Sequence, residues 1–149
     1  MILIADSNII VSALISPKGE IAKILKDKSN IQFIAPDYMF MEIEAHWDKI
    51  KKLSPLSNKD LKKELSFYKE KIKQYQVIKI PKETILKAYR LVLDIDQDDT
   101  FFIALHLHLG YKIWSGDKTL KEGLKQKGFS HFFIEIEDIK QRLYLKGKA

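Results

Sequence analysis

The sequence predicts an α/β protein, a three-layer sandwich in which helices cover both faces of a central parallel sheet of about five strands. Short apolar runs alternate with longer stretches of helical periodicity along the 149 residues, as in repeated strand–helix units. The first run, residues 2–5, is continuously apolar, which is typical of a strand buried on both faces. No linker, repeat or low-complexity tract interrupts this order, so we expect one domain over residues 1–149.

Turn and capping signals define the expected elements in order. Pro17 and Gly19 separate two short helices, Asp37 is placed to cap the helix after the second strand, and Pro81 opens a later helix. We expect strands at 2–5, 31–35, 76–80, 111–114 and 132–136. We expect helices at 9–15, 20–27, 38–52, 59–75, 82–93, 100–109, 118–126 and 138–145.

The composition excludes several classes of site. The chain has no cysteine, which rules out disulfides, thiolate metal sites and thiol nucleophiles. The apolar N-terminal stretch has no basic flank, and no apolar stretch approaches the ~20 residues of a membrane span. We therefore expect a soluble, cytoplasmic protein with no membrane partner.

The net charge of +6 is unevenly distributed. Residues 49–90 contain 13 Lys and Arg against 4 Asp and Glu, while the remainder of the chain is slightly acidic. A basic segment of this kind predicts a polyanionic partner. The alternative is a solvated, lysine-rich helix face without a partner.

Four carboxylates are placed where the chain leaves the predicted sheet. Asp6 ends the first strand, Asp117 follows the strand at 111–114, Asp99 lies in the first turn of the preceding helix, and Glu42 lies in the helix after the second strand. Ligands of open α/β sheets bind beyond the carboxyl ends of the strands. Four carboxylates gathered there repel one another unless a cation neutralises them, and oxygen ligands suit Mg²⁺ or Mn²⁺. Such ions activate water and hold a phosphodiester for displacement.

Each acid also has a purely structural interpretation. Asp6 and Asp117 can cap the helices that follow them, and Asp96 can cap the helix that begins near Asp99. Glutamates on a helix surface, such as Glu42 and its neighbour Glu44, are ordinary. Three small polar residues are open to both interpretations, as turn residues or as supports around a metal or water: Ser7, Asn8 and Ser115.

The order and spacing of these motifs resemble the PIN-domain family of metal-dependent nucleases, in particular members grouped with the toxins of toxin–antitoxin pairs. The resemblance spans residues 1 to about 136. It rests on four segments: Ile-Ala-Asp6-Ser-Asn-Ile, Ala-Pro36-Asp-Tyr-Met-Phe-Met-Glu42-Ile, Asp96-Gln-Asp-Asp99-Thr-Phe-Phe-Ile-Ala-Leu and Trp-Ser115-Gly-Asp117-Lys-Thr-Leu. The family's four acids fall on Asp6, Glu42, Asp99 and Asp117, with Asp98 and Glu44 as the rival positions.

The resemblance implies RNA hydrolysis that requires Mg²⁺ or Mn²⁺. Metal ligation would fall to Asp6, Asp99 and Asp117, with Asp96 as an auxiliary ligand or only a cap and Glu42 as a ligand or water-positioning base. Thr119 stands where many relatives carry a further acid, which weakens any second metal. The implied partners are RNA, an antitoxin protein if the chain is a toxin, and a second copy in a homodimer. With this resemblance, the helices within about 38–75 would form a projecting arm. Four lysines of this arm are expected to hold the RNA backbone: Lys51, Lys52, Lys62 and Lys63.

The sequence motifs match other classes of protein less well. A nucleic-acid-binding or scaffold domain without turnover is the main alternative. A phosphatase would need an acid where Asn8 stands, and a receiver domain would need paired acids before its phosphorylated one. The four histidines, His46, His106, His108 and His131, lack the spacing of a joint site. Five aromatic residues are expected in the core and not as base-stacking platforms: Phe101, Phe102, Trp114, Phe132 and Phe133.

Overall fold

A parallel sheet forms the centre of the computed structural model, which describes residues 1–28 and 30–148; Ser29 and Ala149 lie outside the described residues. In this part of the chain the sheet has four strands in the order β3-β2-β1-β4, all parallel. The strands are β1 Ile2–Ala5, β2 Gln32–Pro36, β3 Ile72–Tyr75 and β4 Ile113–Trp114. The predicted helix-covered parallel sheet is confirmed, with four strands in place of about five.

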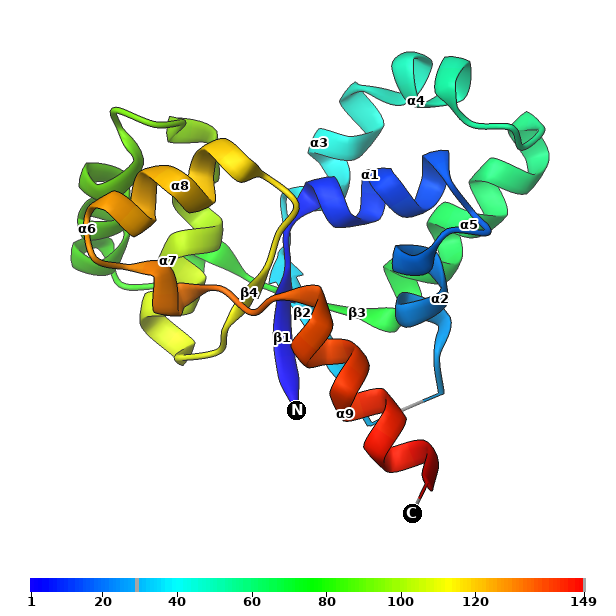
Figure 1. Cartoon of the computed structure of the whole chain (residues 1–149). Helices are drawn as coiled ribbons and strands as arrows, with labels where there is room; N and C mark the ends of the chain where they lie inside the picture. The colour runs from blue at the N-terminus through cyan, green and yellow to red at the C-terminus, as the bar shows by residue number, and fades with distance from the viewer. Residues whose placement is uncertain (29, 149) are drawn as a thin grey trace.

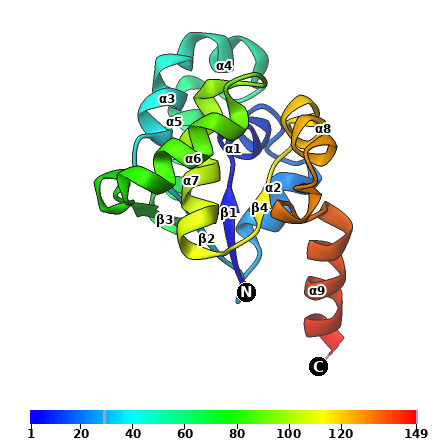
Figure 2. The same cartoon turned by 90° about the vertical axis from the view of Figure 1, so that its left-hand side faces the viewer.

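Helices lie on both sides of this sheet (Figure 1). One side carries α1 Ser7–Ile15, α2 Glu20–Lys26, α3 Met39–Ala45, α4 Trp47–Leu53 and α5 Asn58–Lys71. The other side carries α6 Lys82–Val92, α7 Thr100–Leu109 and α8 Lys118–Gln126. The last helix, α9 Ile136–Lys148, extends away beside the N-terminal end of β1 (Figure 2).

The core forms where the most apolar segments meet. Leu3, Ile4 and Ala5 of β1 are buried, as the continuous apolar run predicts, and α7 packs against both β1 and β2. Most of the first two turns of α7 is buried, which explains its almost entirely apolar sequence. Gly110 ends this helix in the left-handed conformation, with φ of +83°, where glycine is favoured.

The third strand lies earlier than the sequence pattern indicated. We expected a helix to residue 75 and a strand at 76–80, but α5 ends at Lys71, β3 occupies Ile72–Tyr75, and Val77–Lys79 form a short 3₁₀ helix. Ile72 fits the helical spacing of the buried side of α5, yet it pairs with Phe33 of β2. Pairing with β2 satisfies the backbone polar groups of this segment, so the tertiary context overrides its local helical pattern.

Two further elements differ from expectation. The helix expected over 38–52 is divided at His46 into α3 and α4. The strand expected at 132–136 is reduced to a single bridge between Ile113 and Phe133, and α9 already begins at Ile136.

The predicted arm is an arch formed by α3, α4 and α5, and α4 lies farthest from the sheet (Figure 1). The arch is anchored on α1, since the Ser54 hydroxyl donates to the Leu14 carbonyl at 2.7 Å. Buried Ile50, Leu61 and Tyr68 face inward from α4 and α5. The arch is therefore part of the folded core with an exposed outer surface.

On the opposite side, α8 packs closely on the acidic segment 94–99. A Cβ atom built at Gly123 would lie 2.6 Å from Ile95 Cδ1, so a larger residue there would force Ile95 to move. This contact holds α8 against the acidic segment. Among the described residues, we find no helix with the length and apolarity needed to cross a membrane.

Candidate metal centre

The order in which strands are added to the sheet reverses between β1 and β4. From β1 the chain builds β2 and β3 on one side and later returns to add β4 on the other. Such a switch point opens a crevice that commonly binds ligands. The Asp6 amide donates to the Trp114 carbonyl at 3.1 Å, so the acid after β1 lies directly beside the end of β4.

Asp6 is almost completely buried, with 1% of its surface exposed. Its Oδ1 accepts a hydrogen bond from the Ser7 amide at 2.7 Å, and its Oδ2 accepts from the Ser115 hydroxyl at 2.7 Å and from Asn8 Nδ2 at 3.2 Å. A carboxylate offers about four acceptor positions. With a longer contact of 3.4 Å from the Ser7 hydroxyl to Oδ1, four hydrogen bonds from its neighbours hold Asp6 firmly.

The small polar residues singled out in the sequence surround Asp6. Asn8 Oδ1 accepts from the Gly116 amide at 2.9 Å, and the Ser115 hydroxyl accepts from the Asp117 amide at 3.0 Å. These bonds link the segment after β1 to the segment after β4. Asn8 and Ser115 therefore determine the relative positions of Asp6 and Asp117.

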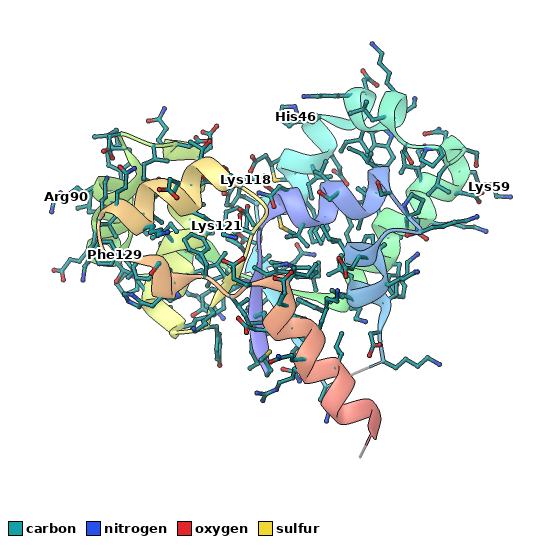
Figure 3. The ribbon with its side chains drawn as sticks, in the orientation of Figure 1. His46, Lys59, Arg90, Lys118, Lys121 and Phe129 are labelled. Carbon is teal, nitrogen blue, oxygen red and sulfur yellow. The ribbon has the colours of Figure 1, made fainter. Side chains whose placement is uncertain are left out.

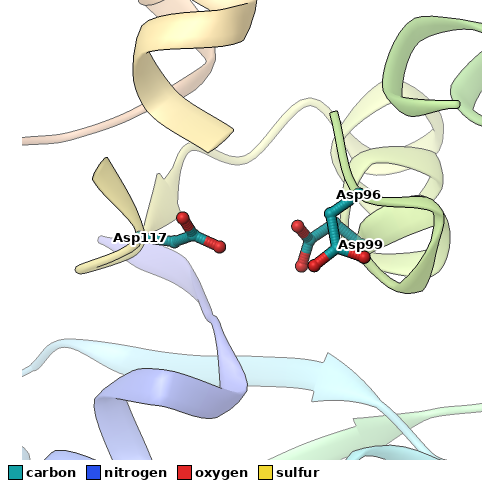
Figure 4. Close-up of side chains that lie close together, drawn as sticks. All are labelled: Asp96, Asp99 and Asp117. Atoms are coloured by element: carbon teal, nitrogen blue, oxygen red, sulfur yellow. The ribbon is translucent and has the colours of Figure 1, made fainter. Parts of the chain in front are cut away.

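The closest group of carboxylates consists of Asp96, Asp99 and Asp117 (Figure 4). One oxygen from each lies within 4.8 Å of the others. Asp117 faces the other two across a gap between the start of α8 and the start of α7. Among the residues that the structure describes, this is the group whose spacing suits a metal ion, and Asp6 is not one of its three members.

Two members of this group also cap helices. Asp117 Oδ1 accepts from the Leu120 amide at 3.1 Å at the start of α8, and Asp96 Oδ1 accepts from the Asp98 amide at 3.0 Å. The capping and ligand interpretations are therefore compatible, because each cap uses one carboxylate oxygen. The cap orients the carboxylate and leaves the other oxygen for the centre.

Glu42 lies on the same side of the site as these acids, on α3. Its Oε2 is buried without a hydrogen-bond partner among the described residues. Glu44 instead forms an ion pair with Lys69 of α5, which directs it into the arch. Burial also separates Asp99 from its rival position Asp98. Asp99 is 8% exposed, whereas Asp98 is exposed at the surface.

Burial, together with the charges of neighbouring acids, raises the pKa values of Asp99, Asp6 and Glu42. Burial raises the pKa of Asp99 from 3.8 to about 8, with further contributions from Asp6, Asp96, Asp117 and Glu42. Burial and the charge of Asp117 raise the pKa of Asp6, against the hydrogen bonds from Ser115 and Ser7. Burial, Asp98 and Asp6 raise the pKa of Glu42. The site accumulates negative charge that its own residues do not neutralise.

A hard divalent cation fits these residues. Asp99 Oδ2, like Glu42 Oε2, is buried without a hydrogen-bond partner among the described residues, and an unpaired buried carboxylate oxygen is costly. The donors are all carboxylate oxygens, which Mg²⁺ and Mn²⁺ prefer. A bound cation would offset both the missing hydrogen bonds and the repulsion.

Tyr38 belongs to the site and was not identified from the sequence. Its hydroxyl donates to the Asp98 carbonyl at 3.2 Å, and burial, followed by the charges of Glu42 and Asp6, raises its pKa. The available signal was its spacing, because Tyr38 precedes Glu42 by four residues and so shares its helix face.

The remaining candidates lie outside the cluster. Lys51, Lys52, Lys62 and Lys63 are exposed on α4 and α5 of the arch. His106 Nδ1 lies 2.6 Å from the Tyr111 carbonyl, and His108 Nε2 lies 3.1 Å from the Tyr75 hydroxyl, so both have structural partners. Phe102, Trp114, Phe132 and Phe133 are buried as expected, but Phe101 is only partly buried, which corrects its assignment to the core.

The fold and the site define an α/β protein with a carboxylate centre at the switch point of a parallel sheet. A family model for the PIN domain matches residues 4–142, and the chain therefore belongs to the PIN domain family. PIN domains are generally nucleases that act on nucleic acid, and they typically use divalent metal ions. A comparison with curated proteins found no match to the chain.

Proposed function

We propose that this protein is an endoribonuclease that hydrolyses RNA phosphodiesters with Mg²⁺ or Mn²⁺. The observation that carries the proposal is the group of Asp96, Asp99 and Asp117 oxygens within 4.8 Å of one another, beside the buried Asp6. The unpartnered oxygens of Asp99 and Glu42 support it, because a bound cation would supply the partner that these oxygens lack.

The ligands of the metal would be Asp6, Asp99 and Asp117, with Asp96 as an auxiliary ligand. When bound, the cation supplies charge neutralisation for the phosphate and acidifies a water molecule. Glu42 orients the attacking water by accepting its hydrogen bond and takes up its proton. Ser7, Asn8 and Ser115 hold Asp6 in place, so that the carboxylates do not need to rearrange when the substrate binds.

The direct test is incubation of the purified protein with a panel of single-stranded and structured RNAs, and with matched DNAs, in Mg²⁺ or Mn²⁺. We expect RNA cleavage that EDTA stops and that Asp6→Asn abolishes. Cleavage that survives both treatments would contradict the proposal. RNA binding without any cleavage would favour the alternative of a binding domain that has the fold without turnover.

We also propose that the arm lysines hold the RNA backbone. Replacing Lys51, Lys52, Lys62 and Lys63 by Gln is expected to weaken RNA binding and flatten its salt dependence. The log–log slope should decrease by roughly 0.7 for each phosphate that the variant no longer binds. The measurement is fluorescence polarisation of a labelled RNA at several salt concentrations.

A control with the same change in net charge is available on the other side of the sheet. Replacing Lys79, Lys82, Lys87 and Arg90 by Gln removes four positive charges near α6. If both quadruple variants bind RNA equally well, the arm has no special role. Unchanged affinity of the arm variant at low salt would have the same meaning.

The narrower role of a toxin is a proposal that rests on the resemblance. It includes an antitoxin protein as partner, a homodimer and a cytoplasmic location. A neighbouring gene for a small DNA-binding protein would support the antitoxin partner. Growth arrest on expression would support the toxin role, and a dimer mass in sedimentation would support the homodimer.

A further inference from the structure

A recess next to the carboxylate site includes Glu42 in its lining. It has a volume of about 480 Å³ and is built from α3 and from the segment that leads into α7. The volume is within the ~300–1,000 Å³ typical of small-molecule pockets. We call it the α3–α7 pocket.

One wall of the α3–α7 pocket is apolar and aromatic. Tyr38 and Phe101 contact each other edge to face, with ring centroids 5.1 Å apart. Met41 completes this wall and is 72% exposed. An exposed methionine beside a partly exposed aromatic pair contributes little to the core, and it offers a contact surface for a flat ring.

The polar groups of the pocket carry hydrogen-bonding capacity and negative charge. Gln97 and Asp98 come from the acidic segment, and Glu42 and His46 come from α3 and its C-terminal end; Figure 3 shows His46 at the end of α3 that lies farther from the sheet. Two carboxylates repel a phosphate, so the pocket suits an uncharged ring. Carboxylate and amide side chains recognise the exocyclic amino groups of bases.

The same two segments build the pocket and part of the metal centre. Glu42 lines the pocket and its charge contributes to the raised pKa of Asp99, and Asp98 of the pocket directly precedes Asp99 in the chain. A nucleotide with its phosphate at the carboxylates can therefore place its base in the pocket.

We propose that the α3–α7 pocket binds a nucleobase with an exocyclic amino group, next to the phosphodiester held at the carboxylate cluster. The proposal rests on the proposed function, and it adds a choice of base to an otherwise sequence-independent contact with the backbone. Stacking on Phe101 and Met41 supplies affinity, while Asp98 and Gln97 select the amino group.

The test measures binding of fluorescent hexaribonucleotides of adenosine, purine riboside, uridine and abasic ribose, in Ca²⁺ at low salt. Purine riboside differs from adenosine only by the missing amino group. The wild type is expected to bind the adenosine hexamer on the order of tenfold more tightly than the abasic hexamer, with purine riboside and uridine in between.

Phe101→Leu removes the ring but keeps an apolar side chain, and Met41→Ala changes a side chain so exposed that folding is preserved. Both variants are expected to bring the adenosine-to-abasic ratio of affinities close to one. Phe67→Leu is the matched control, because Phe67 is a 42% exposed phenylalanine on α5, outside the pocket, and it should leave the ratio unchanged.

Equal binding of the adenosine and abasic hexamers by the wild type would overturn the proposal. So would a ratio that neither Phe101→Leu nor Met41→Ala alters, which would indicate another occupant such as an apolar protein segment. If base-dependent binding is found and no RNA is cut, only the proposed hydrolysis fails. If RNA is cut and binding ignores the base, only the base pocket fails.

Discussion

Asp99→Asn is expected to reduce RNA cleavage by about 10²–10³-fold or more, in line with the loss of a central electrostatic group in other active sites. Asp99 is 8% exposed, and its Oδ2 lacks a partner among the described residues. An amide at this place provides a weaker, uncharged ligand for a cation. Initial cleavage rates at saturating Mg²⁺ or Mn²⁺ measure the effect.

The matched control is Asp94→Asn, at the other end of the same acidic segment. Asp94 forms an ion pair with Lys127 and lies at the surface, so its replacement should leave the rate within about twofold because surface pairs contribute little. A second pair of variants tests which glutamate belongs to the site. Glu42→Gln should lower the cleavage rate strongly, and Glu44→Gln should not. Equal rates for the wild type and Asp99→Asn would remove Asp99 from the site.

The thermal stability of the metal-free protein is expected to fall as the pH rises from about 4 to about 8. Asp99 has a pKa of about 8 in the folded protein and an ordinary value of 3.8, so the folded state holds a proton that the unfolded state has lost in this range. Stability therefore decreases with rising pH. The raised pKa values of Asp6 and Glu42 act in the same direction.

Melting temperatures in EDTA at pH 5 and pH 8 test this prediction, with Asp99→Asn as the comparison. The variant should be more stable than the wild type at pH 8, and its pH dependence should be smaller. Mn²⁺ should raise the melting temperature of the wild type at pH 8. At 100 times its dissociation constant, a ligand that binds only the folded state adds about 2.7 kcal/mol to the free energy of unfolding. A wild type that is more stable at pH 8 than at pH 5 in EDTA, with no response to Mn²⁺, would contradict the charge-repulsion account.

Local sequence patterns predicted correctly those elements whose bounds depend on interactions within the segment itself. The apolar run before Asp6 predicted β1, Pro81 predicted the start of the helix that is α6, and Gly110 predicted the end of α7. The meeting of the acids also followed from the sequence, because carboxyl ends of parallel strands share one edge of a sheet.

Long-range contacts decided the elements that the patterns misplaced. Ile72 fits a helix by its spacing, and pairing with Phe33 makes it the start of β3. The strand expected near Phe133 has a single bridge to Ile113, since β4 itself is only two residues long.

For the site, the sequence alone determined which carboxylates are available and that they face the same crevice. Only the tertiary structure decided that Asp96 joins Asp99 and Asp117 in one group, and that Ser7, Asn8 and Ser115 hold Asp6 by hydrogen bonds. It also placed Tyr38 and Phe101 beside Glu42 as the wall of an open pocket. The physical reason is that spacing along the chain fixes the face of a helix, whereas distances between side chains depend on how helices pack across the sheet.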